Sequence, residues 1–363
     1  MDFETIRKIF NAFDTGYEAV GFSECSNGNI NRTYFVKTEG GEKYVLQRVN
    51  TNVFKNPVAL MDNVLGVTAF LASKIAAAGG DPERETLNMA VTSESKPYYV
   101  DLDGGFWRMY RFVSGASSYN SAEKEGLLYE AARSFGIFQR QLSDFPAETL
   151  FETIPYFHDT AKRYEAFETA VAEDAAGRAS DFGEEIASLR KYKDRASIIV
   201  DGIAEGRIPV RVTHNDTKLN NILIDDATGK GLCVIDLDTV MPGSLLYDFG
   251  DSIRFAANNT AEDDPNYDNI WLRLDRYEEY ASGFLAGVGE SITDEEKKLL
   301  PMSVFILTYE LALRFATDYL NGDTYFKINY PEHNLVRTRA QLRLTEDIDK
   351  KLDDMWEITK KYI

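Results

Sequence analysis

Hydrophobic and polar positions alternate along the first third of the chain, as they do in half-buried β-strands. Two such runs, Tyr34–Thr38 and Tyr44–Val49, flank the polar turn Glu39–Glu42, and this pattern predicts a hairpin. A second hairpin is predicted over residues 97–113, with its turn at Asp103–Gly105. The chain therefore begins with a β-rich region, which ends near residue 114.

The apolar spacing also predicts helices. One begins at Asn56–Pro57 and ends before Gly79–Gly80, with apolar residues at helical spacing between them. Beyond Gly115 the pattern is mainly helical, and Asn120 with Glu123 can form a capping pair for the first of these helices. The predicted later helices cover roughly 128–142, 158–172, 183–204, 273–287, 294–320 and 332–362.

This shift in pattern predicts an α+β protein with two lobes. Residues 1–114 would form a small β-rich lobe that binds nucleotide, and residues 115–363 a larger, mostly helical lobe for catalysis and substrate binding. A length of 363 residues is ample for two lobes.

Charge and cysteine content narrow the class of protein. The formal net charge of −19 makes nucleic acid and anionic membranes improbable partners. Two cysteines are too few for a disulfide framework. The start of the chain lacks a signal-peptide pattern, and charged residues interrupt the apolar stretch Leu299–Leu320. We expect a cytoplasmic protein, either a monomer or a weak homodimer.

The segment His214–Asn221, followed by Asp236, carries the most informative chemistry. Written as H-x-D-x-K-x-x-N plus a later aspartate, it supplies the groups needed to transfer a phosphoryl group from a magnesium nucleotide. Asp216 can orient and deprotonate the acceptor hydroxyl, and Lys218 can offset charge on the phosphoryl group. Asn221 and Asp236 are candidate ligands for Mg²⁺.

The two candidate metal ligands flank a predicted β-hairpin. The runs 222–225 and 232–236 are separated by a turn composition. If Asp225 lies opposite Leu232, Asn221 falls opposite Asp236, because the residue numbers of directly opposed partners in an antiparallel pair have a constant sum. The alternative is an ordinary hairpin whose aspartates are solvated. His214 is either a second base or, as we favour, a packed structural histidine.

The nucleotide-binding residues are less well marked. The loop Ser26–Asn31, which includes Gly28 and Asn29, has the small polar residues that can donate to phosphates, but by itself this composition favours an ordinary turn. The next hairpin contains the strand expected to carry a phosphate-binding lysine. Gln47 takes the position of that lysine, and Arg48 should point to the opposite face of the strand. Which of these two side chains contacts phosphate is left open.

Three charged residues recur on an otherwise apolar helix. Glu310, Arg314 and Asp318 are spaced by four, which permits a ladder of ion pairs along the helix. The alternative is a polar cavity lined by this stripe, because unpaired buried charges are costly. In that case Arg314 would donate to substrate oxygens and Tyr325 would lie beside it.

The most specific stretches are Arg211–Asn221, Asp236–Gly243 and Tyr247–Phe255. They resemble the aminoglycoside phosphotransferase/choline kinase superfamily of small-molecule kinases. Two further stretches, Phe157–Thr160 and Tyr330–Arg339, look like its N-acetylhexosamine 1-kinase branch. The resemblance spans nearly the whole chain.

The resemblance implies a protein-kinase-like fold with ATP and Mg²⁺ in a cleft between the lobes. It makes Asp216 the catalytic base and Asn221 and Asp236 the metal ligands. It further implies that the backbone of Arg111 to Val113 pairs with adenine. The residues implied to line the sugar site are Phe255, Arg314 and Tyr325.

One departure from the superfamily concerns the phosphate contacts. Gln47 stands where the wider superfamily has Lys or Arg, and the acidic partner of that residue has no clear counterpart. Asp62 is the nearest candidate.

The sequence therefore predicts an ATP-dependent sugar 1-kinase that phosphorylates the anomeric hydroxyl of an N-acetylhexosamine. A kinase for choline, an aminoglycoside, homoserine or another sugar is the alternative. A nucleotide-binding pseudokinase scaffold is the third possibility.

Overall fold

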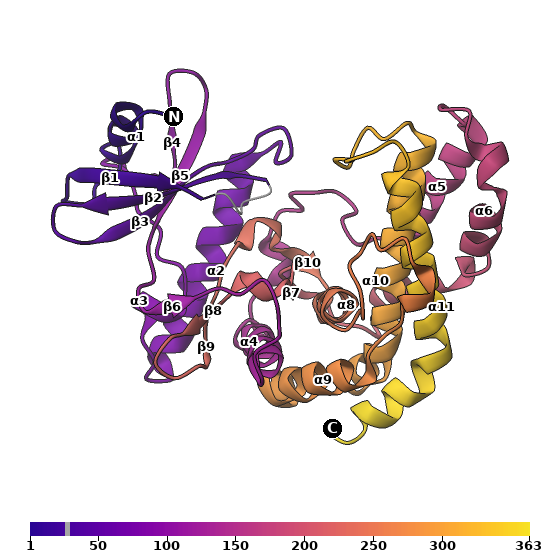
Figure 1. Cartoon of the computed structure of the whole chain (residues 1–363). Coiled ribbons are helices and arrows are strands. Elements are labelled where there is room, and N and C mark those ends of the chain that lie inside the picture. The colour runs from indigo at the N-terminus through magenta and orange to yellow at the C-terminus, as the bar shows by residue number, and fades with distance from the viewer. Residues whose placement is uncertain (26–29) are drawn as a thin grey trace. The chain divides into compact units, whose positions relative to one another are not determined.

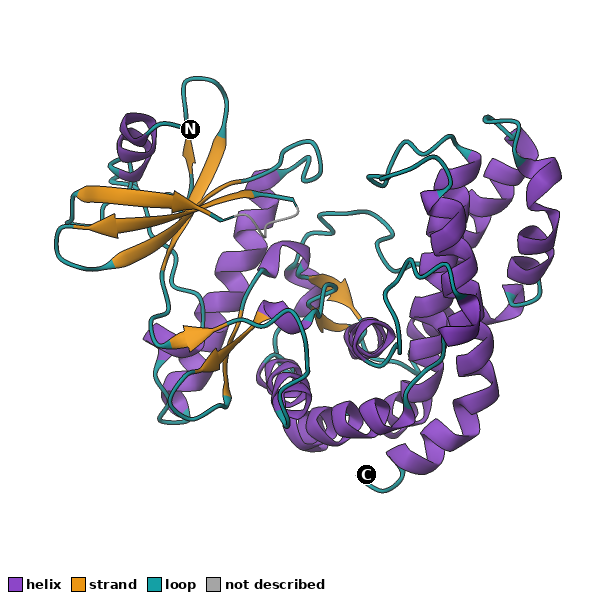
Figure 2. Cartoon of the chain, in the orientation of Figure 1, coloured by secondary structure: helices purple, strands orange, loops and turns teal. Residues whose placement is uncertain are grey.

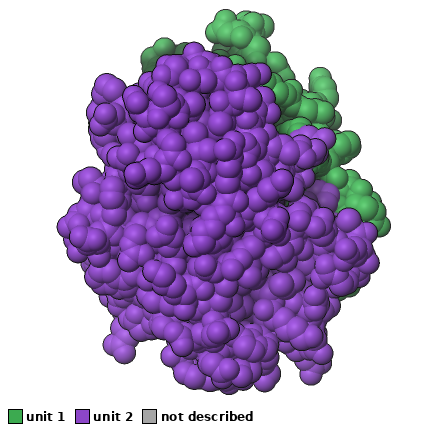
Figure 3. All heavy atoms as spheres, turned by 90° about the vertical axis from the view of Figure 1, so that its right-hand side faces the viewer, with its two compact units in different colours: residues 1–117, 144–155, 223–241 green, residues 118–143, 156–222, 242–363 purple. Residues whose placement is uncertain are grey.

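The computed structural model of the chain describes residues 1–25 and 30–363, which form two compact units. Figure 3 colours the atoms of each unit. Unit 1 comprises Met1–Ser117, Asp144–Pro155 and Leu223–Met241, and unit 2 comprises Ser118–Ser143, Tyr156–Ile222 and Pro242–Ile363. Both units are discontinuous along the chain, whereas the sequence predicts a single boundary between residues 114 and 115.

Unit 1 contains a five-stranded antiparallel sheet in the order β1-β2-β3-β5-β4 (Figures 1 and 2). The strands are β1 (Ala19–Glu24), β2 (Arg32–Thr38), β3 (Lys43–Arg48), β4 (Tyr99–Val100) and β5 (Phe106–Arg111). Val36 pairs with Tyr44 across β2 and β3, and Tyr99 pairs with Trp107 across β4 and β5. Both predicted hairpins are confirmed, and β1 is a further strand.

A short helix, α1 (Phe3–Phe10), packs on one face of this sheet. The Asp2 side chain caps the helix by accepting a hydrogen bond from the Thr5 N–H. Apolar side chains of α1, among them Ile6 and Phe10, form a buried core with Trp107 and neighbouring strand residues. Because side chains alternate along a strand, Arg108 belongs to the other face of the sheet.

Two further helices belong to unit 1, α2 (Pro57–Ala77) and α3 (Pro82–Glu85). The Asn63 side chain of α2 is buried and donates to the carbonyls of Phe151 (2.8 Å) and Val240 (2.9 Å). Its oxygen accepts the Phe151 N–H at 2.8 Å. Asp62 is exposed and forms no ion pair among the described residues, so it does not supply the acidic partner considered for this helix.

A second sheet has the order β6-β8-β9, formed by β6 (Ala116–Ser117), β8 (Ile222–Asp225) and β9 (Gly231–Val234). The predicted β8–β9 ribbon is thus present, but its predicted register is wrong. The Asp225 N–H donates to the Lys230 carbonyl (2.8 Å), so Asp225 lies beside Lys230 and not Leu232. The tighter turn is possible because Gly229 adopts a φ of 69°.

The Asp225 carboxylate reinforces this turn. It accepts hydrogen bonds from the backbone N–H and the hydroxyl of Thr228, both at 2.9 Å, and it pairs with Arg84. The Arg84 guanidinium and the Thr228 groups lower the pKa of Asp225 to about 2. A local carboxylate cap, together with the glycine, therefore fixes the register two residues away from the expected one.

Unit 2 is mainly helical (Figure 2). Its helices are α4 (Leu127–Gln141), α5 (Thr160–Glu173), α6 (Gly183–Arg190), α7 (Ile198–Ala204), α8 (Leu245–Ala256), α9 (Leu274–Val288), α10 (Asp294–Leu320) and α11 (His333–Thr359). The strands β7 (Arg211–Thr213) and β10 (Met241–Gly243) form a two-stranded sheet.

Helix α10 is the core helix of unit 2, where it packs against α5, α8 and α11. Both α2 and α10 are long and apolar enough to cross a membrane by length and composition. In α10, however, 83% of the most apolar window is buried inside the structure, as expected of a core helix. Its N-terminus carries a capping box between Thr293 and Glu296.

Three details of the predicted helices need correction. The predicted helix over 183–204 is interrupted between α6 and α7, where Tyr192 packs edge-on against Phe305 and Tyr309. Helix α4 begins at Leu127 after Gly126 in a left-handed conformation, so Asn120 caps no helix. Instead the Asn120 side chain accepts a hydrogen bond from Asn220. Helix α8 is not among the predicted elements.

Candidate active site

The candidate catalytic segment follows β7 in unit 2 and is held by the buried carboxylate of Asp248 on α8. One oxygen of Asp248 accepts the backbone N–H of His214 (3.0 Å) and the other accepts that of Asn215 (2.8 Å). Gln139 of α4 donates to the same carboxylate at 2.6 Å. Burial raises the pKa of Asp248, which lies fully inside unit 2.

Two hydroxyl groups complete this attachment to α8. The Thr217 hydroxyl donates to the Asp248 carbonyl (2.6 Å), and the Ser252 hydroxyl donates to the Thr217 carbonyl (2.7 Å). Between these anchors Asn215 adopts a φ of 64°, a left-handed conformation that costs a non-glycine residue about 1–3 kcal/mol. The segment before and after Asp216 is thus rigidly held, as a catalytic group requires.

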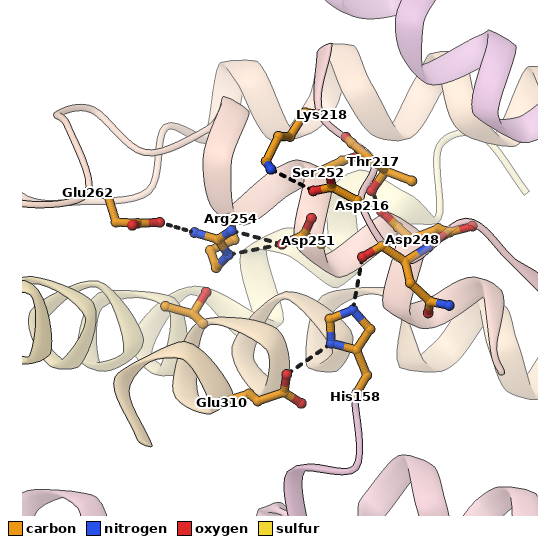
Figure 4. Close-up of polar contacts among 12 residues, drawn as sticks. His158, Asp216, Thr217, Lys218, Asp248, Asp251, Ser252, Arg254, Glu262 and Glu310 are labelled. Atoms are coloured by element: carbon orange, nitrogen blue, oxygen red, sulfur yellow. Dashed lines mark hydrogen bonds and ion pairs between the residues drawn. The ribbon is translucent and has the colours of Figure 1, made fainter. Parts of the chain in front are cut away.

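The predicted catalytic pair lies at this rigid segment. Asp216 Oδ1 and Lys218 Nζ are 2.8 Å apart, and Figure 4 shows the two side chains pointing toward each other. Burial alone would lower the pKa of Lys218, but the Asp216 carboxylate raises it above its ordinary value. The ammonium group is therefore charged and held next to the candidate base.

Asn221 is also drawn to Asp216. Its side-chain nitrogen donates to the Asp216 carbonyl at 2.7 Å, so its side-chain oxygen is the atom left for another ligand. An amide oxygen is a hard donor of the kind that Mg²⁺ prefers. Asp236 belongs to unit 1 and adopts a φ of 61° directly after the β9 ribbon. Their sharing one metal ion stays a prediction.

His214 is packed, as favoured from the sequence. Its ring is fully buried and lies edge-on to Phe135 (5.6 Å) and Phe138 (6.1 Å). Its Nδ1 accepts the Asp216 N–H at 3.3 Å. The ring therefore packs against the segment as a structural residue and is not placed as a second base.

A buried histidine outside the predicted motif contacts the same segment. His158 Nδ1 lies 2.9 Å from Glu310 and its Nε2 lies 3.3 Å from the Asn215 carbonyl (Figure 4). Thr160 donates to the other oxygen of Glu310 at 2.7 Å. Burial alone would lower the pKa of His158, but the Glu310 carboxylate raises it above its ordinary value. A doubly protonated ring donates to both neighbours.

This pair predicts a pH dependence of stability. A histidine whose folded pKa is raised above 6.5 stabilises the fold below that value and loses its contribution as pH rises through the folded pKa. We expect the thermal midpoint of the wild-type protein to fall over that range relative to the midpoint of His158→Gln. Glu310→Gln should show the same flattened profile, and a wild-type profile parallel to both variants would contradict the assignment.

A second charged cluster on α8 lies near Lys218. Asp251 pairs with Arg254 (2.8 Å), which also pairs with Glu262 (2.9 Å), as Figure 4 shows. Burial alone would raise the pKa of Asp251, but Arg254, His158 and Lys218 lower it on balance. The carboxylate of Asp251 is therefore surrounded by positive charges next to the catalytic segment.

The charged stripe on α10 is not an ion-pair ladder. Glu310 pairs with His158, and Asp318 accepts the backbone N–H groups of Thr324, Tyr325 and Phe326 at 2.7–2.9 Å. Within the described chain Arg314 forms no ion pair with either acid. Its guanidinium lies instead beside three aromatic rings. The ring centroids of Phe157, Tyr325 and Phe326 are 5.5–5.9 Å away.

A second arginine accompanies Arg314. Arg163 of α5 donates to the Phe157 carbonyl (3.0 Å), and its buried Nε has no hydrogen-bond partner among the residues that the structure describes. Burial and the charge of Arg314 lower the pKa of Arg163. Neither arginine has an acidic ion-pair partner among the described residues.

The structure brings together some of the predicted sugar-site residues. Arg314 and Tyr325 are in contact, and Tyr325 is 70% exposed. Phe255, at the end of α8, is half-exposed and makes no ring or cation–π contact with them in the part of the chain described. These assignments to sugar binding stay predictions.

The predicted nucleotide residues belong to unit 1. Gly28 and Asn29 lie outside the described residues. The Arg111 side chain pairs with Glu42 (3.3 Å) and Glu83 (3.1 Å), and Val113 is buried. Arg48 lies near the Trp107 ring, on the face opposite Gln47 as the alternation predicts.

Gln47 is part of a buried network. Its side-chain oxygen accepts from Arg108 Nε (3.0 Å) and Nη2 (2.9 Å), and also from the Tyr110 hydroxyl. Its nitrogen donates to the Thr33 hydroxyl at 2.9 Å. Arg108 also forms an ion pair with Asp238, which is buried and therefore not the solvated aspartate of the alternative reading.

Four residues important to this geometry carry no role in the sequence interpretation: Arg108, His158, Asp238 and Asp248. His158 and Asp248 stand inside stretches that carry the family resemblance, which is the only signal that marks them. Arg108 lies in an ordinary strand pattern, and only its cross-strand pairing with Gln47 reveals it.

Comparison with known proteins finds solved structures of similar fold. Similar solved structures include an aminoglycoside phosphotransferase from Alicyclobacillus acidocaldarius (TM-score 0.63, 13% identity, covering 98% of this chain and 96% of that one). A choline kinase from Cryptosporidium parvum has a TM-score of 0.59 and 15% identity, and 99% of each chain is covered. An amicoumacin kinase in complex with AMP-PNP and Ca²⁺ has a TM-score of 0.57 and 16% identity, with 99% and 94% covered.

At these identities the likeness shows the fold, which is the predicted protein-kinase-like fold. The family is shown by a sequence model. The model described as the phosphotransferase enzyme family matches residues 21–283, well over half of the chain. This chain is therefore a member of the phosphotransferase enzyme family.

Proposed function

We propose that this phosphotransferase moves the γ-phosphoryl group of ATP onto the anomeric hydroxyl of an N-acetylhexosamine, giving the sugar 1-phosphate. Asp216 accepts the hydroxyl proton, and Lys218 offsets charge on the phosphoryl group. Asn221 and Asp236 would hold Mg²⁺, which when bound neutralises charge on the nucleotide phosphates. Catalysis then rests on positioning, without a covalent enzyme intermediate.

The observation that carries the acceptor class is the environment of Arg314. Arg314 and Arg163 form no ion pair among the described residues, and their two positive charges would disfavour a cationic acceptor such as choline or an aminoglycoside. A neutral sugar suits them better. Aromatic rings can pack on the sugar ring, and a guanidinium group can donate to hydroxyl or acetamido oxygens.

Arg314 also lies close to the catalytic segment in the fold of unit 2. It is one helical turn from Glu310, which holds His158, and His158 contacts the Asn215 carbonyl next to Asp216. A sugar beside Arg314 can thus present a hydroxyl to Asp216. The anomeric position itself is supported by the resemblance to the N-acetylhexosamine 1-kinase branch.

The direct test is a coupled assay of ADP release with different acceptors. N-acetylglucosamine, N-acetylgalactosamine and choline should be offered separately, with and without Mg²⁺. Magnesium-dependent ADP release that requires an N-acetylhexosamine is the expected result. Release that requires choline would place the protein among kinases for other small alcohols, and nucleotide binding without any turnover would indicate a scaffold.

The proposal predicts a selective effect of Arg314→Gln. Losing a charged donor to the sugar should raise the KM for the N-acetylhexosamine about 10- to 100-fold, since such a bond contributes roughly 1.5–3 kcal/mol. The KM for ATP should stay within about twofold. Steady-state kinetics with each substrate varied in turn measures both. Arg190→Gln, which removes a half-exposed surface arginine, is the control. An unchanged sugar KM in Arg314→Gln would remove Arg314 from the site.

A further inference from the structure

The buried Arg108 network, on the face of the five-stranded sheet opposite α1, has no role in the function proposed so far. Thr33, Gln47 and Arg108 are consecutive partners across β2, β3 and β5. The Arg108 side chain is only 1% exposed, and its Nε and Nη2 groups donate hydrogen bonds to the side-chain oxygen of Gln47. A charge this deeply buried persists only when it is paired.

The partner of Arg108 is Asp238, in the turn that begins at Asp236. Asp238 is buried and its second oxygen accepts from the Asn31 side chain at 2.5 Å. Asp236 is the residue that starts the short 3-10 turn Leu237–Thr239, so it is separated from Asp238 by one residue. A second anchor follows at Val240, whose carbonyl accepts from Asn63. The turn is therefore tied to the sheet at Asp238 and to α2 at Val240.

The conformation of Asp236 needs such support. Its φ of 61° lies in the left-handed region, which aspartate adopts more readily than most residues but which still costs about 1–3 kcal/mol without support from its surroundings. Of the two anchors, the one at Asp238 is the nearer to Asp236 and is charged. Residues that hold a metal ligand from behind commonly change metal affinity when they are replaced.

The same network explains the residue at position 47. An amide oxygen there accepts two hydrogen bonds from the Arg108 guanidinium, and the amide nitrogen is used by Thr33. A lysine ammonium in its place would stand against a buried guanidinium, and two like charges without water between them repel strongly. The glutamine is thus the consequence of a cation on the neighbouring strand.

We propose that Arg108 is a positioning residue for the metal site: by pairing with Asp238 it fixes the turn that begins at Asp236, while Gln47 serves Arg108 and not a nucleotide phosphate. The inference rests on the proposed function only through the role of Asp236 as a metal ligand. The buried cation of this sheet is then Arg108 of β5, and its role is structural.

The test is the Mg²⁺ dependence of nucleotide binding, measured without any acceptor. The rise in thermal midpoint with ATP present is followed as Mg²⁺ is increased, for the wild-type protein, Arg108→Gln and Asp238→Asn. Both variants should need at least about tenfold more Mg²⁺ for half of the effect. Arg7→Gln is the control, since Arg7 is an exposed arginine of α1 in the same unit with no proposed contact to nucleotide, and its Mg²⁺ dependence should match wild type. An Arg108→Gln titration that coincides with the control would overturn the proposal.

Two other variants test the role of Arg108 if Arg108→Gln does not fold. If Arg108→Gln shows no cooperative unfolding, Arg108→Lys keeps the charge and loses the paired geometry, and Asp238→Asn keeps the shape of the partner. Wild-type Mg²⁺ dependence in both would equally reject the role of Arg108. If the wild-type protein turns over no sugar, the proposed acceptor is rejected. The Mg²⁺ titration uses no acceptor, so it still tests the role of Arg108.

Gln47→Lys separates the two roles of position 47. We expect it to lower the thermal midpoint, and the added Arg108→Gln change to recover part of that loss because one of the two buried cations is gone. Tighter MgATP binding by Gln47→Lys than by wild type would show that position 47 faces the phosphates, against the proposal.

Discussion

Asp216→Asn is expected to lower kcat by about 10²- to 10⁴-fold, the range that a positioned general base contributes. Asparagine keeps the size of the side chain but cannot accept the proton of the acceptor hydroxyl. The backbone anchors at Asp248 and Ser252 do not involve the Asp216 side chain, so the segment should keep its conformation. Sugar-dependent ADP release measures the loss.

The control for this variant is Asp226→Asn, at an exposed position of the β8–β9 loop, which should keep wild-type turnover. Binding of MgATP by Asp216→Asn should also be retained, since Asp216 is not among the proposed metal ligands. Full turnover in Asp216→Asn would remove the base assignment. Loss of nucleotide binding together with turnover would point instead to a general loss of structure.

Asp248→Ala is expected to destabilise unit 2 strongly. It leaves three buried donors without their acceptor: the N–H groups of His214 and Asn215, and the Gln139 amide. Each unsatisfied buried donor costs roughly 1–3 kcal/mol, so a loss of about 3 kcal/mol or more in the free energy of unfolding is expected. Denaturant unfolding of the purified protein measures it.

Asp353→Ala provides the comparison, because this aspartate of α11 is exposed and should change the free energy of unfolding by less than about 0.5 kcal/mol. Asp248→Asn should fall between the two, since one side-chain oxygen remains as an acceptor. If Asp248→Ala unfolds at the same denaturant concentration as Asp353→Ala, the carboxylate does not hold the segment.

The sequence predicts those parts of the fold in which the local pattern and the tertiary structure agree. The β2–β3 and β4–β5 hairpins have turn residues between alternating runs, and α10 contains the long apolar stretch Leu299–Leu320. Helix α8 escaped prediction because several of its buried residues are polar. Asp251 and Arg254 pair with each other inside the unit, and Asp248 accepts the backbone N–H groups of His214 and Asn215, which are distant in sequence. No helical pattern can show such partners in advance.

The candidate site divides in the same way. Asp216, Lys218 and Asn221 are close in sequence, so their contacts follow from a single motif. Arg108 and Asp238 are 130 residues apart, and the pairing of His158 with Glu310 spans 152 residues. The strand pattern predicts the wrong register for the β8–β9 ribbon because a carboxylate cap and a glycine decide the length of the turn.

Asn63 also has a consequence for how the chain folds during synthesis. Its one side chain joins three stretches of unit 1 that are distant in sequence, the last of them at Val240. A nascent chain that has not yet reached this residue lacks the third stretch, whatever the state of its leading sheet. Unit 1 is therefore completed only after the chain as far as Val240 has left the ribosome, although its sheet is made well before, so that the order of synthesis and the order of assembly differ.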